Sequence, residues 1–372
     1  MTQPKQLYIA GMGMITSVGM NTAMTSASVN AGISAYSITK HENEKGQPIT
    51  MALISDDVFN CVEAATGLAL DQGNRFNQRH DHVTIMAAIA LQEACTNLTT
   101  ESPVPFIMAH PEHRFDQTNL SSLSDNLTNV VSPWVDSALC RSLYSGRAAG
   151  IEAIKLVFDY LYDSHHNYFI VGGSDSYLDE NRLQALDKTD RLLYVNANNG
   201  FAPGEGAGYL VLTRDPALAL VKGGNIIALS PPGIAQEQGH LTSEQPYRGD
   251  GLDQAFKQIL SEHQQNDISS IYSSMNGENH WAKELGVAQM RNNKSFTENV
   301  IINHPAEYFG DLGSATVPVL IGLSAENLWS EPQACKHLVY SSSDSATRGV
   351  IVLTKQAAPV TENAAQANKD IS

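Results

Sequence analysis

Two patterns of apolar residues alternate along the chain. Short continuous apolar runs, typical of buried strands, are separated by segments whose apolar residues recur at helical spacing. The expected strands lie at 6–19, 105–110, 168–176, 200–214, 269–277, 299–304, 337–343 and 349–354. The expected helices lie at 80–98, 145–162, 252–263, 280–291 and 312–327. This alternation predicts an α/β protein in which helices cover mixed sheets.

The second part of the chain repeats the content of the first. After residue 222 the order of strand and helix begins again, which favours two pseudo-duplicated halves at 1–222 and 223–357. The first half contains a polar, irregular excursion at 112–137. The tail at 358–372 lacks aromatic residues and large apolar clusters, so we expect it to be disordered.

A turn of small residues opens into an apolar helix at "RSLYSGRAAGIEAIKL", residues 141–156. Apolar side chains surround most of the helix that follows, which predicts burial on nearly every side up to about residue 162. A turn of this kind is how a chain presents a nucleophile at a helix N-terminus. No cysteine lies at that point.

Composition and charge exclude several classes of function. The net charge of −16 disfavours binding to nucleic acid or to an anionic membrane. No apolar run is long enough to span a membrane, and no secretory leader is evident. The cysteines are widely spaced, which fits a reducing cytoplasm. They are Cys61, Cys95, Cys140 and Cys335.

The sequence gives no reason to expect a metal or another cofactor. His80 and His82 are two residues apart on a helical segment, so their side chains diverge. His165 and His166 adjoin in a loop. The glycine-rich "PGEGAG" at 203–208 lacks the lysine and hydroxyl of a phosphate-binding loop.

Three runs, in matching order, resemble the β-ketoacyl synthases, which are condensing enzymes of the thiolase fold. They are "YIAGMGMITSVG", "FIVGGSDS" and "GFAPGEGAGYLVL". The resemblance extends over nearly the whole chain and implies a five-layer αβαβα fold, a dimer, and acyl chains delivered by acyl carrier protein. In active members a cysteine at the helix N-terminus takes the acyl group as a thioester, and two histidines on later loops support decarboxylation and stabilise the developing oxyanion.

The positions that match the family's catalytic residues carry other side chains here. The nucleophile position falls on Tyr144, or on Leu143 if the register slips, and a phenol with a pKa near 10 does no thioester chemistry. The first histidine position is Asn276, which donates a hydrogen bond but relays no proton. The second is Gly310, and the family's lysine position is Pro305.

Three further features bear on activity. His280 and His304 lie near the altered positions; a structural or surface role is expected for the first, and a capping or core role for the second. Where the family has a Gly-Phe-Gly-Gly loop that gates the acyl pocket, this chain reads "SSSDSATRG" at 341–349. The backbone freedom and the phenylalanine of that loop are both absent.

An alternative keeps catalysis with Cys140, because "DSALC" loosely resembles the family's Asp-Thr-Ala-Cys. Cys140 would then lie about a turn before the elbow, and no partner histidines would be restored. A buried structural thiol is the commoner role for such a residue.

The resemblance therefore implies a catalytically degenerate subunit similar to the chain length factors. Such a chain forms a heterodimer with an active ketosynthase and lines part of the acyl tunnel during polyketide or fatty-acid-type elongation. An aryl polyene product is compatible with this interpretation. Two alternatives are an active β-ketoacyl-ACP synthase, an acyltransferase that uses Cys140, and a homodimeric module that binds acyl carrier protein or a small acyl ligand.

Overall fold

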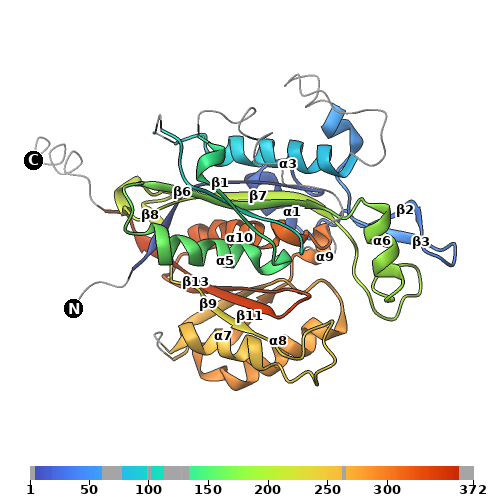
Figure 1. Cartoon of the computed structure of the whole chain (residues 1–372). Coiled ribbons are helices and arrows are strands. Elements are labelled where there is room, and N and C mark those ends of the chain that lie inside the picture. The colour runs from blue at the N-terminus through green and yellow to red at the C-terminus, as the bar shows by residue number, and fades with distance from the viewer. Residues whose placement is uncertain are drawn as a thin grey trace, which may run out of the picture.

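The helices and strands are stacked in five layers (Figure 1). The computed structural model describes residues 5–60, 78–98, 100, 102–112, 127, 134–261 and 265–359. Helix α3 forms one outer layer and helices α7 and α8 form the other, with α5 and α10 between the two sheets. This arrangement confirms the αβαβα fold expected from the sequence.

The first sheet follows the strand order β1-β7-β6-β4-β5. Its central strands β6 and β7 are buried along their whole length, because helices cover both faces of the sheet. β5 is parallel to β4 and lies at the end of the order, so it is an edge strand among the strands that the structure describes. The bounds are β1 Leu7–Thr16, β4 Phe106–Ala109, β5 Cys140–Leu143, β6 Tyr168–Ser176 and β7 Glu205–Thr213.

The second sheet follows the order β11-β10-β12-β13-β8, and β9 pairs with β13. Strand β8 pairs antiparallel with both β13 and β1, so hydrogen bonding runs without a break from one sheet into the other. The bounds are β8 Asn225–Leu229, β9 Gly233–Gln236, β10 Ile268–Ser273, β11 Phe296–Asn303, β12 Lys336–Ser342 and β13 Thr347–Ala357.

The layers are held together by three large apolar clusters. The central cluster joins α5 and α10 to both sheets, and the two outer clusters join α3 to the first sheet and α7 with α8 to the second. Gly150 of α5 lets the two central helices approach, since a Cβ there would lie 2.7 Å from Cβ of Val317. The bounds are α3 Gln78–Ala94, α5 Ala149–Leu156, α7 Asp250–Leu260, α8 Asn279–Arg291 and α10 Thr316–Ser330.

Smaller elements complete the described chain. Asn21 caps helix α1, because its side chain accepts a hydrogen bond of 2.8 Å from the Met24 amide. Helix α6 and the hairpin β2–β3 project together from one side of the layers (Figure 1). The bounds are α1 Thr22–Asn30, β2 Ser37–Glu42, β3 Pro48–Met51, η2 Ser137–Leu139, η3 Gly146–Ala148, η4 Val157–Leu161, α6 Glu180–Asp187, η5 Pro216–Leu218, η6 Asn293–Ser295, α9 Ala306–Phe309 and η7 Gly313–Ala315.

The helix predicted at 145–162 differs from the expectation. It begins as the 3-10 turn η3, continues as α5 and ends in the π-helical turn η4. Tyr160 in that last turn is 79% exposed, so the expectation of burial on nearly every side is wrong there. The periodicity of the apolar residues does not register the wider π turn, which rotates the final side chains toward solvent.

Some expectations fall outside the described residues. Most of the excursion at 112–137 and the tail from 360 onward are not described, and the boundaries of the two halves stay a prediction. Within the described segments, every helix is too short or too polar to cross a bilayer.

Candidate functional site

The elbow at the start of the central helix is formed by residues 144–148. The chain leaves edge strand β5, passes Tyr144 and Ser145, and turns at Gly146, whose φ of +62° lies in the left-handed region that favours glycine. Tyr144 is half-buried and stacks on His110, with ring centroids 4.9 Å apart. The nucleophile position predicted from the sequence therefore carries a phenol packed on an imidazole.

Arg147 is the buried charge of the elbow. Its Nη1 donates to Asp311 Oδ2 at 2.6 Å, and its Nη2 donates to Asp344 Oδ1 at 2.6 Å. The guanidinium carbon lies 4.4 Å from the Trp281 ring centroid. Burial alone lowers the pKa of Arg147, but the two carboxylates more than offset this and raise it above its ordinary value. Arg147 is thus a fixed positive charge at the start of the helix.

A second arginine extends the network. Arg191 forms a bidentate pair with Glu278, at 2.7 and 2.8 Å, and donates to Asp344 Oδ2 at 2.6 Å. Asp344 therefore bridges Arg147 and Arg191. Burial opposes the charge of Arg191, and Asp344 followed by Glu278 raises its pKa well above the ordinary value. We call Arg147, Arg191, Glu278, Asp311 and Asp344 the ion network.

Asn276, at the first predicted histidine position, lies in the same place. Its Nδ2 donates to Asp311 Oδ2 at 2.7 Å and to Glu278 Oε2 at 3.1 Å. Asp311 also accepts from the Tyr177 hydroxyl at 3.1 Å and from the Gly313 amide at 2.8 Å. The structure thus brings the Asn276 loop and the loop after Gly310 together, with Asp311 as the shared acceptor.

Gly310, at the second predicted histidine position, has no room for a side chain. Its φ of 74° and ψ of −173° lie in a region that only glycine adopts readily. A Cβ there would approach the Ala202 carbonyl oxygen to 2.7 Å and the Gly204 amide nitrogen to 3.1 Å. The backbone excludes an imidazole at this position, and the neighbouring Asp311 directs a carboxylate into the site instead.

The loop at 343–346 is pinned to the elbow. The Ser343 hydroxyl donates to the Ser145 carbonyl oxygen and accepts from the Ala148 amide at 3.2 Å. The amide of Ser345 donates to Glu112 Oε1 at 3.0 Å. The sequence analysis expected the counterpart of a glycine-rich gate at this loop, and here its hydroxyls tie it to the helix start.

A second buried ion cluster lies beside the first. Asp175, at the end of β6, accepts from Arg182 at 2.8 Å and from Arg79 at 3.1 Å, and it caps the turn η7 by accepting from the Ser314 amide at 3.1 Å. Burial raises the pKa of Asp175, but Arg182 and then Arg79 outweigh it, so the net pKa is lowered. Asp175 is therefore a firmly ionised acceptor.

The space that remains at the site is small. A cavity of about 20 Å³ lies between the elbow and the two ion clusters, which is room for about one water. No cysteine and no histidine is among its lining residues, all of which belong to the described part of the chain. They are Pro111, Glu112, Gly146, Arg147, Asp175, Tyr177, Arg182, Leu186, Gly313 and Asp344.

These side chains offer fixed charges and hydrogen bonds, and the described lining contains neither a thiol nor an imidazole. The arginines stay protonated, and burial raises the pKa of Tyr177 well above its ordinary value. An amide such as that of Asn276 neither gains nor loses a proton near pH 7. The arrangement is suited to holding loops together.

Cys140 lies on edge strand β5, on the face of the sheet that packs against the α3 cluster. Leu143, three residues on, packs against the central cluster that contains α5. The Cys140 thiol donates to the Asp136 carbonyl oxygen at 3.2 Å. Because successive side chains of a strand alternate between its faces, the thiol is directed away from the layer in which α5 begins.

The remaining sequence-predicted positions lie at the margin. Pro305 precedes the short helix α9. His304 is 46% exposed and 3.6 Å from Glu307, which is a surface pair and not the expected core or capping role. His280 is half-buried between Tyr247 and Trp281, with ring centroids 4.7 Å away in each case.

The ion network was not among the sequence-based expectations. Arg147, Asp311 and Asp344 each interrupt a run of small or apolar residues, as in "SGRAAG", "FGDLGS" and "SSSDSA". Charged residues in such runs are almost never buried unless they are paired, so the three together were an available signal. Glu278 and Arg191 have polar neighbours in the sequence, so their burial left no such signal.

Comparison with known proteins gives a consistent result for the fold. No protein-family model and no curated protein sequence matches the chain. Among solved structures, the ishigamide ketosynthase/chain length factor superposes with a TM-score of 0.71 at 17% identity, over 94% of this chain and 99% of that one.

Two other solved structures are similarly related. A type II polyketide synthase acyl-carrier protein in complex with its ketosynthase bound to the hexaketide gives a TM-score of 0.72 at 15% identity, over 95% of this chain and 99% of that one. A ketosynthase in complex with its chain length factor from Xenorhabdus doucetiae gives a TM-score of 0.64 at 14% identity, over 94% of this chain and 98% of that one. The chain has the thiolase-like fold of the ketosynthases and their chain length factors, as its motifs predicted.

Proposed function

We propose that this chain is a non-catalytic subunit of a condensing enzyme, similar to a chain length factor. It pairs with an active ketosynthase and shapes the acyl tunnel while a polyketide or fatty-acid-type chain is extended. The observation that carries the proposal is the cavity at the elbow, which is lined by two ion clusters and by neither a thiol nor an imidazole.

The loss of function is built into the backbone as well as the side chains. Asn276 and Arg147 share Asp311 as an acceptor, so the space in which a substrate carbonyl would react is filled by paired charges. Gly310 leaves no volume for the second imidazole. A packed wall of this kind resists each added methylene at a cost of about 1 to 3 kcal/mol, which is how such a subunit would limit chain length.

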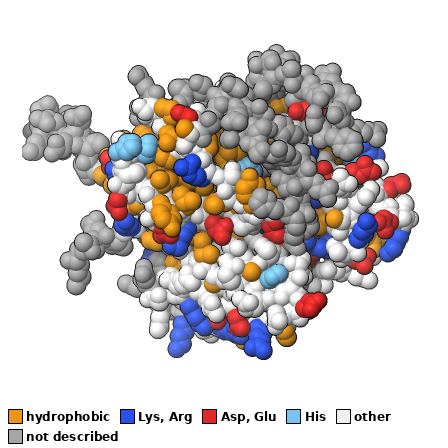
Figure 2. All heavy atoms as spheres, viewed as in Figure 1, with side chains coloured by type: hydrophobic (Ala, Val, Ile, Leu, Met, Phe, Trp, Pro, Cys, Tyr) orange, Lys and Arg blue, Asp and Glu red, His pale blue; other side chains and the backbone are white. Residues whose placement is uncertain are grey.

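A partner surface is suggested by edge strand β5. Arg141 and Ser142 on this strand are exposed, and an edge strand presents backbone groups with which a second chain can pair. Figure 2 shows apolar side chains gathered on the same face, over α5 and the sheet edge beside it. Leu143, Leu156 and Leu161 are partly exposed there. A ketosynthase is the occupant that the proposal requires.

The test is co-expression with a triad-bearing ketosynthase from the same gene neighbourhood, followed by assay with malonyl and acyl groups on acyl carrier protein. We expect condensation from the co-purified pair and none from the isolated chain. Products are measured by mass spectrometry of the acyl carrier protein. Turnover by the isolated polypeptide would overturn the proposal.

A pair of proline variants tests the partner surface. Consecutive amides of a strand point to opposite edges, so of Arg141→Pro and Ser142→Pro one disturbs β4 and the other blocks only the open edge. The variant that blocks only the open edge should keep the far-UV circular dichroism of the parent and lose the ketosynthase during size-exclusion chromatography. Retention of the partner by both folded variants would place the interface elsewhere.

The competing hypothesis, an active acyltransferase that uses Cys140, is addressed by intact mass after incubation with an acyl thioester or a thiol-directed ketosynthase inhibitor. We expect no acyl or inhibitor adduct on Cys140, so the parent chain and Cys140→Ser should give the same adduct pattern. The direction of the thiol, toward the α3 layer, supports this expectation. A stable acyl adduct on Cys140 would favour the active enzyme.

A further inference from the structure

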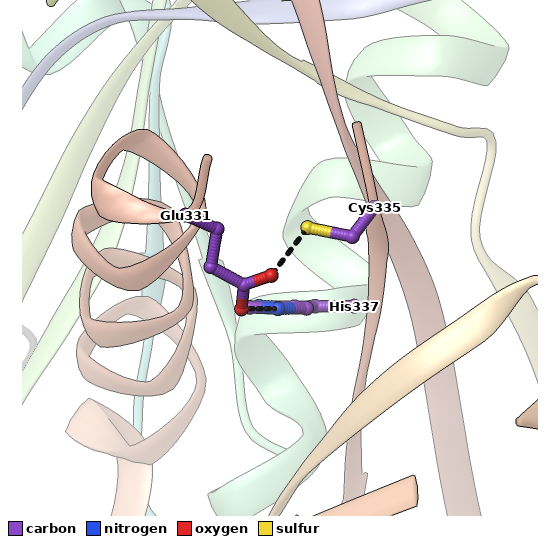
Figure 3. Close-up of side chains that lie close together, drawn as sticks. All are labelled: Glu331, Cys335 and His337. Carbon is purple, nitrogen blue, oxygen red and sulfur yellow. Dashed lines mark hydrogen bonds and ion pairs between the residues drawn. The ribbon is translucent and has the colours of Figure 1, made fainter. Parts of the chain in front are cut away.

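Outside the candidate site, the structure brings a carboxylate, a thiol and an imidazole together at the end of α10 (Figure 3). Glu331 is the residue at which α10 ends. Cys335 and His337 lie just before and just inside β12, and being two residues apart they project to the same face of the strand. Their ligand atoms and that of Glu331 all lie within 4.8 Å of one another.

Each carboxylate oxygen of Glu331 contacts one of the other two side chains. The Cys335 thiol donates to Oε2 at 2.7 Å, and Nε2 of His337 lies 3.1 Å from Oε1. Figure 3 shows both side chains directed at the carboxylate from the strand side. A thiol, an imidazole and a carboxylate that converge in this way are the three donor types found in zinc sites.

The imidazole is fixed from behind. Nδ1 of His337 lies 3.1 Å from the Ser324 hydroxyl, and the ring lies 5.5 Å from that of Tyr272. The side chain of His337 is fully buried. Histidines that bind metals typically have their second nitrogen held by such a partner, which sets the orientation of the ring and the tautomer. Here the arrangement leaves Nε2 for the ligand position.

The protonation states of the cluster determine what a cation must displace. Burial lowers the pKa of His337, which favours the neutral ring that binds a metal. Burial followed by Glu331 raises the pKa of the Cys335 thiol to about 12, so a metal has to displace the thiol proton in order to bind sulfur. Lys355 from β13 faces the cluster, but its ammonium donates to the Glu331 backbone carbonyl and leaves the carboxylate free of it. Lys336 is paired with Asp267.

We propose that Glu331, Cys335 and His337 form a zinc site, with water as the fourth ligand. The Cys335 thiol gives its proton to solvent as the Zn–S bond forms, so a thiolate, a carboxylate and a neutral imidazole balance the charge of Zn²⁺. The bound ion would tie the end of the central helix α10 to strand β12. This inference does not depend on the proposed function.

The distances fit after a small movement. Ligand atoms on a tetrahedral zinc with bonds of about 2.0 to 2.3 Å stand about 3.3 to 3.8 Å apart, somewhat farther than the hydrogen bonds observed here. The Glu331 side chain is 38% exposed, so it can move outward and leave an approach from solvent.

The experiment is metal binding by the purified full-length chain after chelator treatment. Zn²⁺ is titrated by calorimetry, and Co²⁺ is used as a spectroscopic probe, because a thiolate ligand gives a sulfur-to-cobalt charge-transfer band. We expect one equivalent per chain and at least a tenfold loss of affinity, with loss of the band, in Cys335→Ser. Cys140→Ser is the matched control and should keep both.

Glu331→Gln provides a second variant at a partly exposed position, so the test does not depend on a variant that fails to fold. It should weaken Zn²⁺ binding while keeping the parent circular dichroism spectrum. Binding of less than one equivalent by the parent chain would overturn the proposal. A cobalt spectrum that is the same in Cys335→Ser and Cys140→Ser would do so as well.

Discussion

At the scale of the residue, Arg147 is a buried charge with a structural role at the elbow. A guanidinium removed from water is tolerated only when carboxylates face it, and both Asp311 and Asp344 do so at 2.6 Å. The elbow that would present a nucleophile therefore holds the loops at 311 and 344 against the helix.

Replacement of Arg147 by methionine should be strongly destabilising. The variant keeps much of the side-chain volume but leaves the buried Asp311 without its cation and Asp344 with Arg191 alone, so the free energy of unfolding should fall by about 3 to 5 kcal/mol. Urea denaturation provides the measurement. Lys155→Met in α5 is the control, because that lysine forms a half-exposed pair with Asp159 and its loss should cost less than about 0.5 kcal/mol. Equal losses would mean that the ion network contributes little.

Gly310 should accept no side chain. Gly310→Ala combines an unfavourable backbone region with a contact of 2.7 Å to a carbonyl oxygen, so we expect a loss of about 3 kcal/mol or more in unfolding free energy. Gly46→Ala is the matched control, since Gly46 has a φ of +71° and open space around it. It should lose only the left-handed strain of about 1 to 2 kcal/mol. A smaller loss at Gly310 than at Gly46 would contradict the steric argument.

His280 should make the protein less stable in mild acid. Burial, and then the charge of Arg348, lower the pKa of this imidazole below its usual 6.5. The unfolded chain therefore takes up the proton first, and the stability that is present above pH 6.5 is lost as the pH falls toward the lowered value. Unfolding free energies measured in urea across this range should fall more steeply for the parent than for His280→Gln. An equal dependence of unfolding free energy on pH in the two proteins would contradict this role of His280.

The side-chain contacts of the site were less predictable from sequence than the order of its turns. The order of motifs assigns Tyr144, Asn276 and Gly310 to the family's catalytic positions, and that assignment stays a prediction. The partners of Asp311 did not follow, since Arg147 and Asn276 reach it across 164 and 35 residues of sequence. Pairing over such distances is set by the layers and leaves no local pattern.

At the scale of the element, local patterns predicted most strands and helices well. The strand expected at 168–176 has those bounds, and it is buried along its whole length because both of its faces are covered. The helix expected from 312 begins as α10 only at Thr316, after the 3-10 turn η7 in which the Ser314 amide is held by Asp175. A hydrogen bond from a distant strand end fixed this boundary, and no spacing rule contains it.

The contact between the central helices should be sensitive to one methyl group. Gly150→Ala places a Cβ 2.7 Å from Cβ of Val317, so α5 and α10 must separate, at a cost of about 1 to 3 kcal/mol in unfolding free energy. Gly286→Ala in α8 is the control, because nothing lies within 4 Å of its Cβ position. There the better helix former should stabilise by about 0.5 to 1 kcal/mol. Opposite signs for the two variants are the expected result.

At the scale of the whole molecule, the two halves share the central cluster. Strand β8 pairs with β1 on one side and β13 on the other, and the central cluster contains residues from Leu7 to Leu353. Each half supplies its own sheet and its own outer cluster, but the central helix layer takes α5 from the first half and α10 from the second. Sequence repetition suggested two halves and could not show this shared layer.

We therefore expect a single cooperative unfolding transition. Fluorescence from Trp134, Trp281 and Trp329 and far-UV circular dichroism should report the same urea midpoint. Fragments 1–222 and 223–372, expressed separately, should lack near-UV circular dichroism and recover it when co-expressed. Independent folding of either fragment would show that the shared layer is not required.

The packing of Gly310 against the turn at 202–204 also bears on how this chain can change over generations. A mutation that introduced an imidazole there would bring the side chain against backbone atoms, so the turn would have to shift before it could fit. A single substitution at Gly310 therefore cannot supply an imidazole without that shift. Anyone wishing to engineer condensation into this scaffold would have to exchange that turn and the 305–313 loop as one unit.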